Sequence, residues 1–478
     1  MKKAQLVFIP APGVGHLIST VEIAKLLISR DERLSVTVLI MKLPFDTAVL
    51  DAYTQSLHAT HRIRFIDLPQ NVHVSFHNSS KSPMTFLSAF VDGHKANVRD
   101  TVAGMAARSE SGQLAGFVVD MFCTSMIDVA NEFGLPTYAF FTSNAAFLGL
   151  KLYLVSLNDD HNKDITEFKD SNTELSVPSF ANPVPSSVLP SVAMDKEGGG
   201  SAMVISVSRR LLETKGIMVN TFSDLEAHAI KSLNDGRTPP LYPVGPIINL
   251  NHKPDDAIMS WLDDQPASSV VFLCFGSMGS FDEDQVKEIA HALERSGHRF
   301  LWALRRPKPE KEKIGSQTEY TDLEGILPEG FLERTAGIGK VIGWAPQVAV
   351  LSHQAVGGFV SHCGWNSILE SVWCGVPVAT WPMYAEQQVN AFQMVKELGM
   401  AVEIRLDYHR DVFRGLNASP AVTAEDIEGG IRRLMEGGSE VRTRVKEMKK
   451  KGRAAVMEGG SSYAALGLFV EDVMTNVQ

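Results

Sequence analysis

The sequence predicts an α/β protein built from two doubly wound parallel-sheet domains in series. Short β-rich runs alternate with helical patterns in both halves of the chain, which is typical of a parallel sheet covered by helices on both faces. A proline-rich segment without periodicity, near residues 242–260, separates the two halves. Because a single core rarely grows to 478 residues, two domains are the expected arrangement.

The first half of the chain carries four predicted strands and two predicted helices. The opening apolar run is cut short by Pro10, as expected for a buried first strand. The strands are expected at Gln5–Pro10, Ser35–Met41, Gly116–Val119 and Thr137–Phe141, and the helices at Ile18–Ser29 and Ser125–Phe133. The stretch from Asn158 to Gly200 is polar and rich in Pro, Ser and Gly, so we expect long loops there, either over a site or as a variable surface.

The second half repeats the alternation. Its strands are expected at Val270–Phe275, Phe300–Leu304, Val341–Ile342, Gly358–Val360 and Val378–Thr380, with helices at Asp284–Ser296 and from Glu440 to Phe469. We therefore expect a first domain over residues 1–242, a linker over 243–260 and a second domain over 261–455. The remaining segment, 456–478, is expected to be helical and to pack back on the first domain.

The composition argues against several classes of protein. A formal net charge of −10 is unfavourable for a nucleic-acid surface. The N-terminal apolar run is shorter than the about 7–15 residues of a signal peptide, and no stretch of about 18 apolar residues predicts a membrane span. Cys123, Cys274, Cys363 and Cys374 show no metal-binding spacing, so we expect reduced thiols and a cytoplasmic location.

The segment Trp344–Gln387 carries the strongest functional pattern. The strand predicted at Gly358–Val360 is followed by a glycine turn and by a helix predicted over Ser367–Cys374, so that Asn366 lies at a helix N-terminus. Free N–H groups and the positive end of the helix dipole favour a diphosphate there. His362, just before the turn, could donate a charge-assisted hydrogen bond to it.

The same helix start allows a purely structural explanation. Ser367 and Glu370 match the S-x-x-E capping box, in which they would only close the first turn of the helix. A cap has no use for Trp344, or for the acid–amide pair Glu386-Gln387 that begins 16 positions after Glu370. These neighbours favour a binding site over a cap.

A glycine turn ending in His16 follows the first predicted strand. It lacks the third glycine of a dinucleotide-binding turn, because Ile18 occupies that position. Two explanations remain for His16: a histidine without chemistry, or a general base at the carboxyl end of a strand, where ligands of open α/β sheets bind. The pKa of histidine lies near physiological pH, which suits a base.

Two further strand ends carry polar side chains. Asp120 ends the third predicted strand and could either cap a turn or orient a base histidine. Thr142 follows the fourth strand, and Ser143 or Asn144 beside it could cap the next helix.

The segment Trp344–Gln387 resembles the signature of plant family-1 UDP-dependent glycosyltransferases, the secondary-product type. The resemblance extends over essentially the whole chain, from the turn at His16 to the final helices, and is closest to the branch that glucosylates flavonoids and related phenols. It implies a GT-B fold, in which two Rossmann-like domains face each other across a cleft.

The resemblance also implies a role for each residue of the donor site. Trp344 would stack on uracil, with Ala345 and Gln347 reading the base, and Glu370 would bind the ribose hydroxyls. The diphosphate would be held by His362, Asn366, Ser367 and Ser277. The sugar would lie beside the backbone of Trp365 and be bound by Glu386 and Gln387.

The catalytic side is implied by the same resemblance. His16 would take the proton from the acceptor hydroxyl, Asp120 would orient His16, and Thr142 would approach the sugar from the acceptor side. We expect aromatic residues to line the acceptor pocket: the region Phe76–Phe90, Phe122, Phe147 and the loops up to Gly200.

The expected activity is that of an inverting hexosyltransferase. Glucose from UDP-glucose, a co-substrate, would pass to a hydroxyl of a small phenolic acceptor in one displacement, without a metal or other cofactor. The D-x-D triplet Asp282–Asp284 opens a predicted helix and is explained by capping. We expect a monomer without nucleic-acid partners. The alternatives are another UDP-sugar, a terpenoid or hormone acceptor, a UDP-sugar epimerase, or a non-catalytic UDP-sugar-binding protein.

Overall fold

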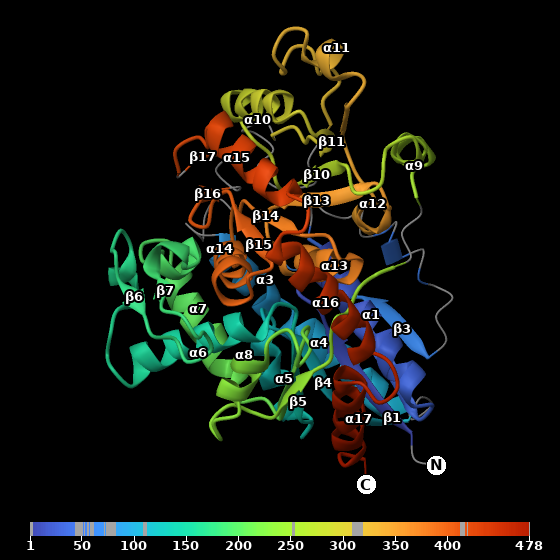
Figure 1. Ribbon diagram of the computed structural model, residues 1–478. Helices are drawn as coiled ribbons and strands as arrows, with labels where there is room; N and C mark the ends of the chain where they lie inside the picture. The colour runs from blue at the N-terminus through green and yellow to red at the C-terminus, as the bar shows by residue number, and fades with distance from the viewer. Residues whose placement is uncertain are drawn as a thin grey trace. The chain divides into compact units, whose positions relative to one another are not determined.

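The structure is a computed structural model that describes residues 3–43, 51, 53–54, 57, 62–70, 72, 83–108, 112–250, 254–307, 319–411, 416–417 and 419–477 (Figure 1). The chain divides into two compact units. Unit 1 comprises residues 1–186, 192–248 and 454–478, and unit 2 comprises residues 187–191 and 249–453.

Unit 1 is built on a seven-stranded parallel sheet with the strand order β3-β2-β1-β4-β5-β8-β9. Its strands are β1 (Ala4–Ile9), β2 (Leu34–Ile40), β3 (Ile63–Asp67), β4 (Gln113–Asp120), β5 (Thr137–Phe141), β8 (Gly216–Val219) and β9 (Leu241–Pro243). Its helices are α1 (Val14–Arg30), α3 (Pro83–Gly93), α4 (Lys95–Arg108), α5 (Ile127–Glu132), α6 (Ala145–Asp159), α7 (Gly200–Leu211), α8 (Ala227–Leu233) and α17 (Ser461–Met474).

Both faces of this sheet are buried, which explains why β1 is apolar nearly throughout. Leu6 and Phe8 pack with α1 and α17 on one face, and Val7 and Ile9 pack with α3, α4 and α5 on the other. Successive side chains of a strand point to opposite faces, so a strand covered on both sides needs a continuous apolar run. Helices on both faces of a parallel sheet are the predicted doubly wound arrangement.

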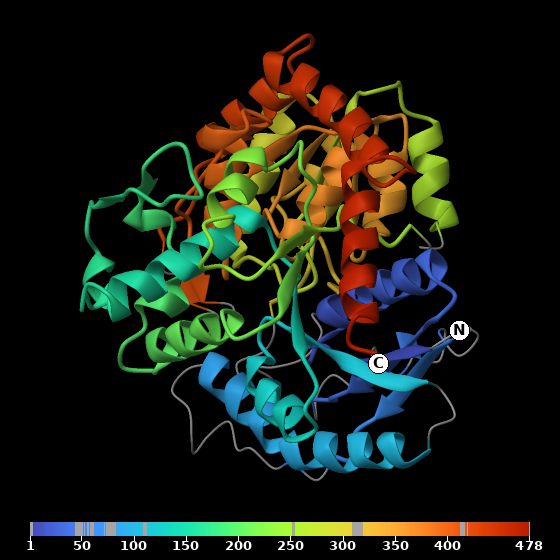
Figure 2. The same ribbon diagram turned by 90° about the horizontal axis from the view of Figure 1, so that it is seen from below.

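The C-terminal helix α17 packs on the sheet of unit 1 beside α1, as Figures 1 and 2 show. The ring of Phe469 lies edge-on against Tyr138 and Tyr242, with centroid distances of 5.0 and 5.4 Å. The hydroxyl of Tyr138 donates to Asp472 Oδ2 at 2.5 Å, and Lys215 lies 3.1 Å from Asp472 Oδ1. The last helix is therefore fixed by both apolar and polar contacts.

Unit 2 repeats the architecture with six parallel strands in the order β12-β11-β10-β13-β14-β15. Its strands are β10 (Val270–Cys274), β11 (Arg299–Ala303), β12 (Gly339–Ile342), β13 (Val356–Ser361), β14 (Val378–Thr380) and β15 (Ala401–Glu403). Its helices are α9 (Asp256–Asp263), α10 (Glu283–Ser296), α11 (Phe331–Thr335), α12 (Gln347–Ser352), α13 (Trp365–Cys374), α14 (Gln387–Phe392), α15 (Ala424–Met435) and α16 (Glu440–Ala455). Two short antiparallel pairs lie outside the main sheets: β6 (Glu174–Leu175) with β7 (Val184–Pro185), and β16 (Arg410–Asp411) with β17 (Leu416–Asn417).

The core of unit 2 also lies on both faces of its sheet. Val271 and Leu273 of β10 pack with α10 and α15, which lie side by side in Figure 1. Phe272, between them, points the other way and stacks on Phe359 of β13 at a centroid distance of 5.3 Å. The central strand is thus apolar on both sides, as in unit 1.

The prediction of two parallel-sheet domains is confirmed, although β3, β8, β9 and β15 were not predicted. Two predicted segments also differ locally. The stretch from Asn158 to Gly200, expected to be loops, contains the β6–β7 pair and several 3₁₀ turns between α6 and α7. The helix expected from Ser367 begins earlier, at Trp365. Both differences arise because tertiary contacts, rather than local propensity, set these boundaries.

We expect Tyr138→Phe to destabilise the docking of α17, because the buried hydroxyl is one of the donors to Asp472. Burial raises the pKa of Tyr138, so this hydroxyl stays a proton donor. The loss of the bond should cost about 1–3 kcal/mol and lower the midpoint of thermal unfolding by roughly 2 °C or more. Tyr242→Phe is the matched control, since it packs on the same Phe469 ring. Equal midpoints for the two variants would contradict the role of the Tyr138 hydroxyl.

Candidate active site

The strand order of each sheet marks one place for chemistry. In unit 1 the order reverses between β1 and β4, and in unit 2 it reverses between β10 and β13. Ligands of open α/β sheets bind at the carboxyl ends of the strands at such a switch point. His16 and Asp120 follow or end the two strands in unit 1, and Ser277 and His362 follow the two strands in unit 2.

His16 and Asp120 form a close pair in unit 1, although 104 residues separate them. The distance from His16 Nδ1 to Asp120 Oδ2 is 2.7 Å. The Asp120 carboxyl is fully buried, whereas 30% of the His16 side chain is exposed. Because Asp120 accepts at Nδ1, the proton of a neutral ring lies on Nδ1 and Nε2 keeps its lone pair. The arrangement is that of a general base with its orienting carboxylate.

Local structure holds this pair in place. His16 is the third residue of α1, and the helix is preceded by Gly13, whose φ of 122° is a conformation that favours glycine. Asp120 Oδ1 accepts from the backbone N–H of Phe122 at 3.0 Å. Asp120 therefore binds His16 through one carboxyl oxygen and the turn after β4 through the other.

Thr142 joins the pair from the end of β5. Its Oγ1 lies 3.4 Å from His16 Nδ1. The cap of the following helix, α6, is Asn144, whose side chain accepts from the N–H of Phe147 at 2.5 Å. The structure thus selects Asn144 over Ser143 as the cap and leaves the Thr142 hydroxyl beside the imidazole.

In unit 2, His362 lies between two glycine turns. A Cβ added to Gly276 or Gly364 would come within 2.7 or 2.6 Å of His362 Nε2, so neither position accepts a side chain without displacing the ring. Cys363, the residue between His362 and Gly364, has a φ of 62°, an uncommon conformation for a residue with a side chain. Ser277 lies exposed in the first of these turns.

The protonation state of the His362 ring is set by its burial. Burial lowers the pKa of His362 to about 4, against a hydrogen bond to the backbone of Cys274, so the ring is neutral at pH 7 without a ligand. Its Nδ1 is buried and has no hydrogen-bond partner within the described part of the chain. A bound diphosphate would raise this pKa, because a nearby anion favours the protonated ring.

The start of α13 contradicts the capping box. The helix is capped by Gly364 without a side-chain bond, and Trp365 is its first residue. Ser367 is therefore inside the first turn, and its hydroxyl accepts from Gln347 Nε2 at 2.8 Å. The capping explanation of Ser367 and Glu370 is wrong because a glycine already occupies the cap. Asn366, half-buried, and Ser367 lie in the first turn of the helix, where backbone N–H groups lack intrahelical partners.

Gln347 links this helix start to Glu370. The same Gln347 Nε2 donates to Glu370 Oε2 at 2.6 Å. Burial raises the pKa of Glu370 to about 7, although the bond from Gln347 acts in the opposite direction. Without a ligand the side-chain amide of Gln347 thus orients Ser367 and Glu370.

The remaining donor-site residues lie at two further loops of unit 2. Trp344 follows β12 and is 54% exposed, an unusual position for so large an apolar ring, while Ala345 beside it is buried. Gln387 is buried, and its Oε1 accepts from the N–H groups of Met383 and Tyr384 at 2.9 and 3.1 Å. Glu386 is the half-buried residue that precedes α14.

The aromatic residues expected around an acceptor have different environments. The ring of Phe122 meets His16 edge-on at 5.6 Å, and Phe147 is a buried residue in the first turn of α6. Phe90 belongs to the apolar core of unit 1, so packing explains it. Residues 76–82 of the region expected to line the pocket lie outside the described residues.

The D-x-D triplet at the start of α10 has a structural explanation. Asp282 caps α10 by accepting from Gln285 N–H at 3.0 Å, which accounts for the D-x-D triplet. Among the described residues there is no group of three or more His, Cys, Asp or Glu side chains suited to a metal ion. No described helix combines the length and the apolar character that a membrane span requires.

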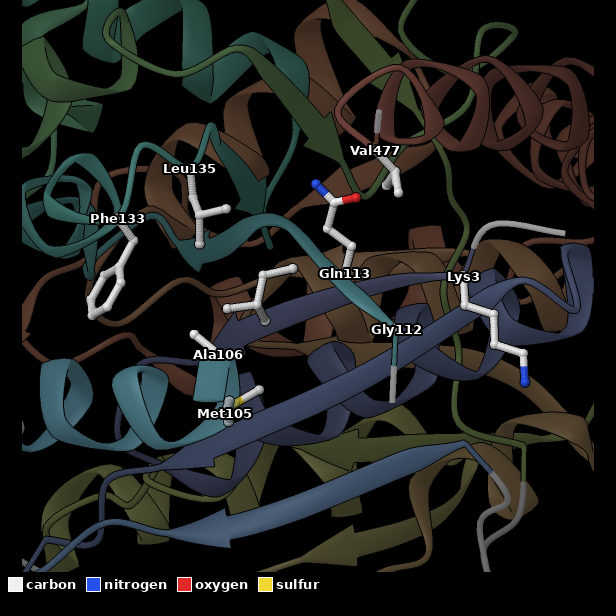
Figure 3. A pocket seen from close by; sticks show the side chains of 9 residues that line it. Lys3, Met105, Ala106, Gly112, Gln113, Phe133, Leu135 and Val477 are labelled. Atoms are coloured by element: carbon white, nitrogen blue, oxygen red, sulfur yellow. The ribbon is translucent and has the colours of Figure 1, made fainter. Parts of the chain in front are cut away.

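A surface pocket of about 490 Å³ lies elsewhere in unit 1, lined by residues that include Lys3, Gln113 and Val477 (Figure 3). Lys3 directly precedes β1 and Gln113 begins β4, so the pocket is at the amino ends of these strands. His16 and Asp120 are at the opposite, carboxyl ends. This pocket is therefore separate from the candidate active site.

Glu226 holds the first turn of α6, and this role was not predicted from the sequence. Its carboxylate is buried and accepts from the N–H groups of Ala145 and Ala146 at 2.9 Å each. A carboxylate after a strand and a polar turn, as in Asn220–Glu226, is an ordinary surface pattern, and no local signal relates it to a helix start 80 residues earlier.

The chain is similar in sequence to a family of known proteins. Residues 207–417 match the model of the UDP-glucoronosyl and UDP-glucosyl transferase family. The chain is 58% identical to UDP-glycosyltransferase 71E1 of Stevia rebaudiana, over 99% of each chain. It is 56% identical to UDP-glucose flavonoid 3-O-glucosyltransferase 6 of Fragaria ananassa, over the full length of both.

A solved structure supports the same assignment. The chain matches that of Medicago truncatula UGT71G1 complexed with UDP-glucose with a TM-score of 0.87, at 44% identity and over 98% of each chain. The two Rossmann-like sheets thus form the expected GT-B fold. The chain belongs to the UDP-glucoronosyl and UDP-glucosyl transferase family and is a glycosyltransferase.

Proposed function

We propose that this enzyme transfers glucose from UDP-glucose to a hydroxyl of a small, flavonoid-like phenol, with inversion, to give a β-O-glucoside. The single observation that carries the proposal is the His16–Asp120 pair, 2.7 Å apart at the switch point of unit 1. A relative 56% identical over its full length is named a UDP-glucose flavonoid 3-O-glucosyltransferase, which supports the donor and the acceptor class.

The acceptor side of the reaction follows from the protonation of the pair. His16 Nε2 takes the proton of the acceptor hydroxyl while the Nδ1 proton stays in the bond to Asp120. The acceptor oxygen forms a bond to C1 of glucose as the bond from C1 to the phosphate oxygen breaks, and that electron pair leaves with UDP. Asp120 stabilises the imidazolium that forms. A positioned base of this kind contributes about 10²–10⁴-fold to the rate.

Unit 2 would supply the donor site. Trp344, exposed at the end of β12, would stack on uracil, with Ala345 and Gln347 beside the base and Glu370 on the ribose hydroxyls. His362 and the first turn of α13 would stabilise the charge that develops on the leaving diphosphate, as donors do in an oxyanion hole. This group comprises His362, Asn366, Ser367 and Ser277.

The sugar would be bound by Glu386 and Gln387, beside the backbone of Trp365. The side-chain oxygen of Gln387, Oε1, already accepts from two backbone N–H groups, so the side chain is held in one orientation. Thr142 would approach the sugar from unit 1. We accordingly propose that residues 1–242 bind the acceptor and residues 261–455 bind the nucleotide sugar.

We further propose that the enzyme works as a monomer in the cytoplasm and without a metal. Its four cysteines are unpaired thiols, which suits a reducing compartment. The donor residues above would stabilise the diphosphate by hydrogen bonds, the task that a divalent cation has in metal-dependent transferases. Retained activity in excess chelator would support catalysis without a metal. Activity that is lost in chelator and restored by Mg²⁺ or Mn²⁺ would contradict it.

The direct test is a donor and acceptor screen with the purified full-length protein. UDP-glucose and other UDP-sugars are each combined with flavonoids, simple phenols and terpenoid alcohols, and products are identified by mass and by the anomeric coupling in NMR spectra. A β-glucoside of a phenol supports the proposal. Interconversion of UDP-sugars without transfer, or binding of UDP without turnover, would replace it with an epimerase or a binding protein.

We expect His16→Ala to lower kcat with a weakly acidic phenol by about 10²–10⁴-fold, because the proton acceptor is lost. The dissociation constant of UDP, measured by calorimetry, should not change, since His16 belongs to unit 1 and the nucleotide residues belong to unit 2. Turnover within a few-fold of the wild type would reject His16 as the base.

We expect UDP affinity to rise with pH through the range around 7, because only the ionised Glu370 accepts two ribose hydroxyls and its pKa without ligand is about 7. Binding lowers this pKa, so affinity should increase by at most about tenfold per pH unit below 7 and level off above it. A terminal phosphate also titrates near pH 6, so Glu370→Gln is the control. If the two proteins show the same pH profile, Glu370 does not bind the ribose.

A further inference from the structure

A buried carboxylate lies at the beginning of α6. Glu226 is 3% exposed, and its two carboxyl oxygens accept separately from the backbone N–H groups of Ala145 and Ala146 at 2.9 Å. These are the first two residues of the helix, whose N–H groups lack intrahelical partners. The third N–H, that of Phe147, is bound by Asn144. Side chains therefore satisfy the first three N–H groups of α6.

This cap is stronger than an ordinary one. A negative charge at a helix N-terminus interacts favourably with the helix dipole, and bonds from backbone N–H to a carboxylate exceed neutral hydrogen bonds in strength. A glutamine at 226 would keep one acceptor oxygen but would direct its own NH₂ group at the second N–H. The geometry therefore specifies a carboxylate rather than a polar group of the same size.

The start of α6 in turn positions Thr142, which lies beside His16. Thr142 precedes Ala145 by three residues, and its Oγ1 lies 3.4 Å from His16 Nδ1. Thr142 and Ser143 are both buried, so the short connection from β5 to α6 has little room to move. Displacement of the first turn of α6 would move Thr142 relative to the imidazole.

Glu226 is itself fixed by its own segment. The buried side chain of Asn220, at the end of β8, accepts from the N–H of Ile247 at 2.8 Å through Oδ1. The N–H of Glu226 donates to the carbonyl of Phe222 at 3.3 Å. The turn from β8 to α8 is thus anchored at both ends and presents the carboxylate from a rigid base.

We propose that Glu226 is a positioning residue for glucosyl transfer, which holds Thr142 against His16 by capping α6. The inference rests on the proposed function, because it takes His16 as the base. Glu226 contacts no reacting atom. Its effect passes through the helix start and the Thr142 hydroxyl.

The test is a double-mutant cycle in the full-length enzyme, with Glu226→Gln, Thr142→Ala and the double variant. Small misplacements in an active site can cost about 10²-fold in rate, so we expect Glu226→Gln to lower kcat tenfold or more. The KM for UDP-glucose and the dissociation constant of UDP should change little. If Glu226 acts through Thr142, the double variant should be about as slow as Thr142→Ala alone, because the two changes remove the same contribution.

Controls separate positioning from a loss of stability. Thr423→Ala removes the cap of α15, where Thr423 accepts from Asp426 N–H at 3.2 Å; Thr423 belongs to unit 2, whereas His16, Asp120 and Thr142 belong to unit 1. It should lower the unfolding temperature without lowering kcat, both in the wild-type enzyme and in the Thr142→Ala variant. Glu226→Asp keeps the charge on a shorter side chain. If Glu226→Gln does not fold, Glu226→Asp takes its place in the cycle. If both fold, the kcat of Glu226→Asp should lie between those of Glu226→Gln and the wild type.

Two outcomes overturn the proposal. One is that Glu226→Gln has the same kcat as the wild type. If only Glu226→Asp folds, the same comparison is made with that variant. The other is a multiplicative effect of the Glu226 and Thr142 substitutions, which would mean that the two residues act independently. Absence of transfer by the wild type in the donor and acceptor screen would instead reject the proposed function. The two failures are therefore distinguishable.

Discussion

The reversal of strand order in each parallel sheet is the constraint on which the candidate site depends. Where neighbouring strands send their connections to opposite faces, no helix covers their carboxyl ends, and backbone and side-chain groups there stay accessible to a ligand. In unit 1 this brings the turn after β1 beside the end of β4, and in unit 2 it brings the turn after β10 beside the end of β13. The His16–Asp120 pair and the setting of His362 both follow from it.

Several polar groups near these strand ends are fully or partly buried, and each has a specific reason to be tolerated. Asp120 accepts from His16 and from the backbone of Phe122, which offsets the loss of hydration. Glu370 accepts from Gln347 but keeps a raised pKa, so its burial is only partly compensated without a ligand. His362 stays neutral because burial outweighs its bond to Cys274. Under the proposed function, a nucleotide would complete the bonding of the last two groups, which would couple affinity and protonation in unit 2.

A helix N-terminus lies near the switch point of each sheet, and the two N-termini are capped differently. The N-terminus of α13 is preceded by Gly364, which makes no side-chain cap bond, whereas that of α6 is closed by Asn144 and Glu226. The contrast has a functional sense. A glycine cap without a side chain suits an anion that must bind and leave, and a closed cap suits the role that we propose for α6, which is to hold the adjacent Thr142 still.

The sequence by itself determined the two parallel-sheet domains, because strands buried on both faces must be continuous apolar runs and the turns between them carry glycine and proline. It also predicted donor-site residues within Trp344–Gln387, a segment of 44 consecutive positions, and it suggested His16 from the strand that precedes it. Only the tertiary structure decided that His16 meets Asp120 and that Gln347 joins Ser367 to Glu370. It alone excluded the capping box and revealed Glu226 at the start of α6. The contacts of His16, Gln347 and Glu226 join segments 20 to 104 positions apart, and such contacts are set by strand order and packing rather than by local pattern.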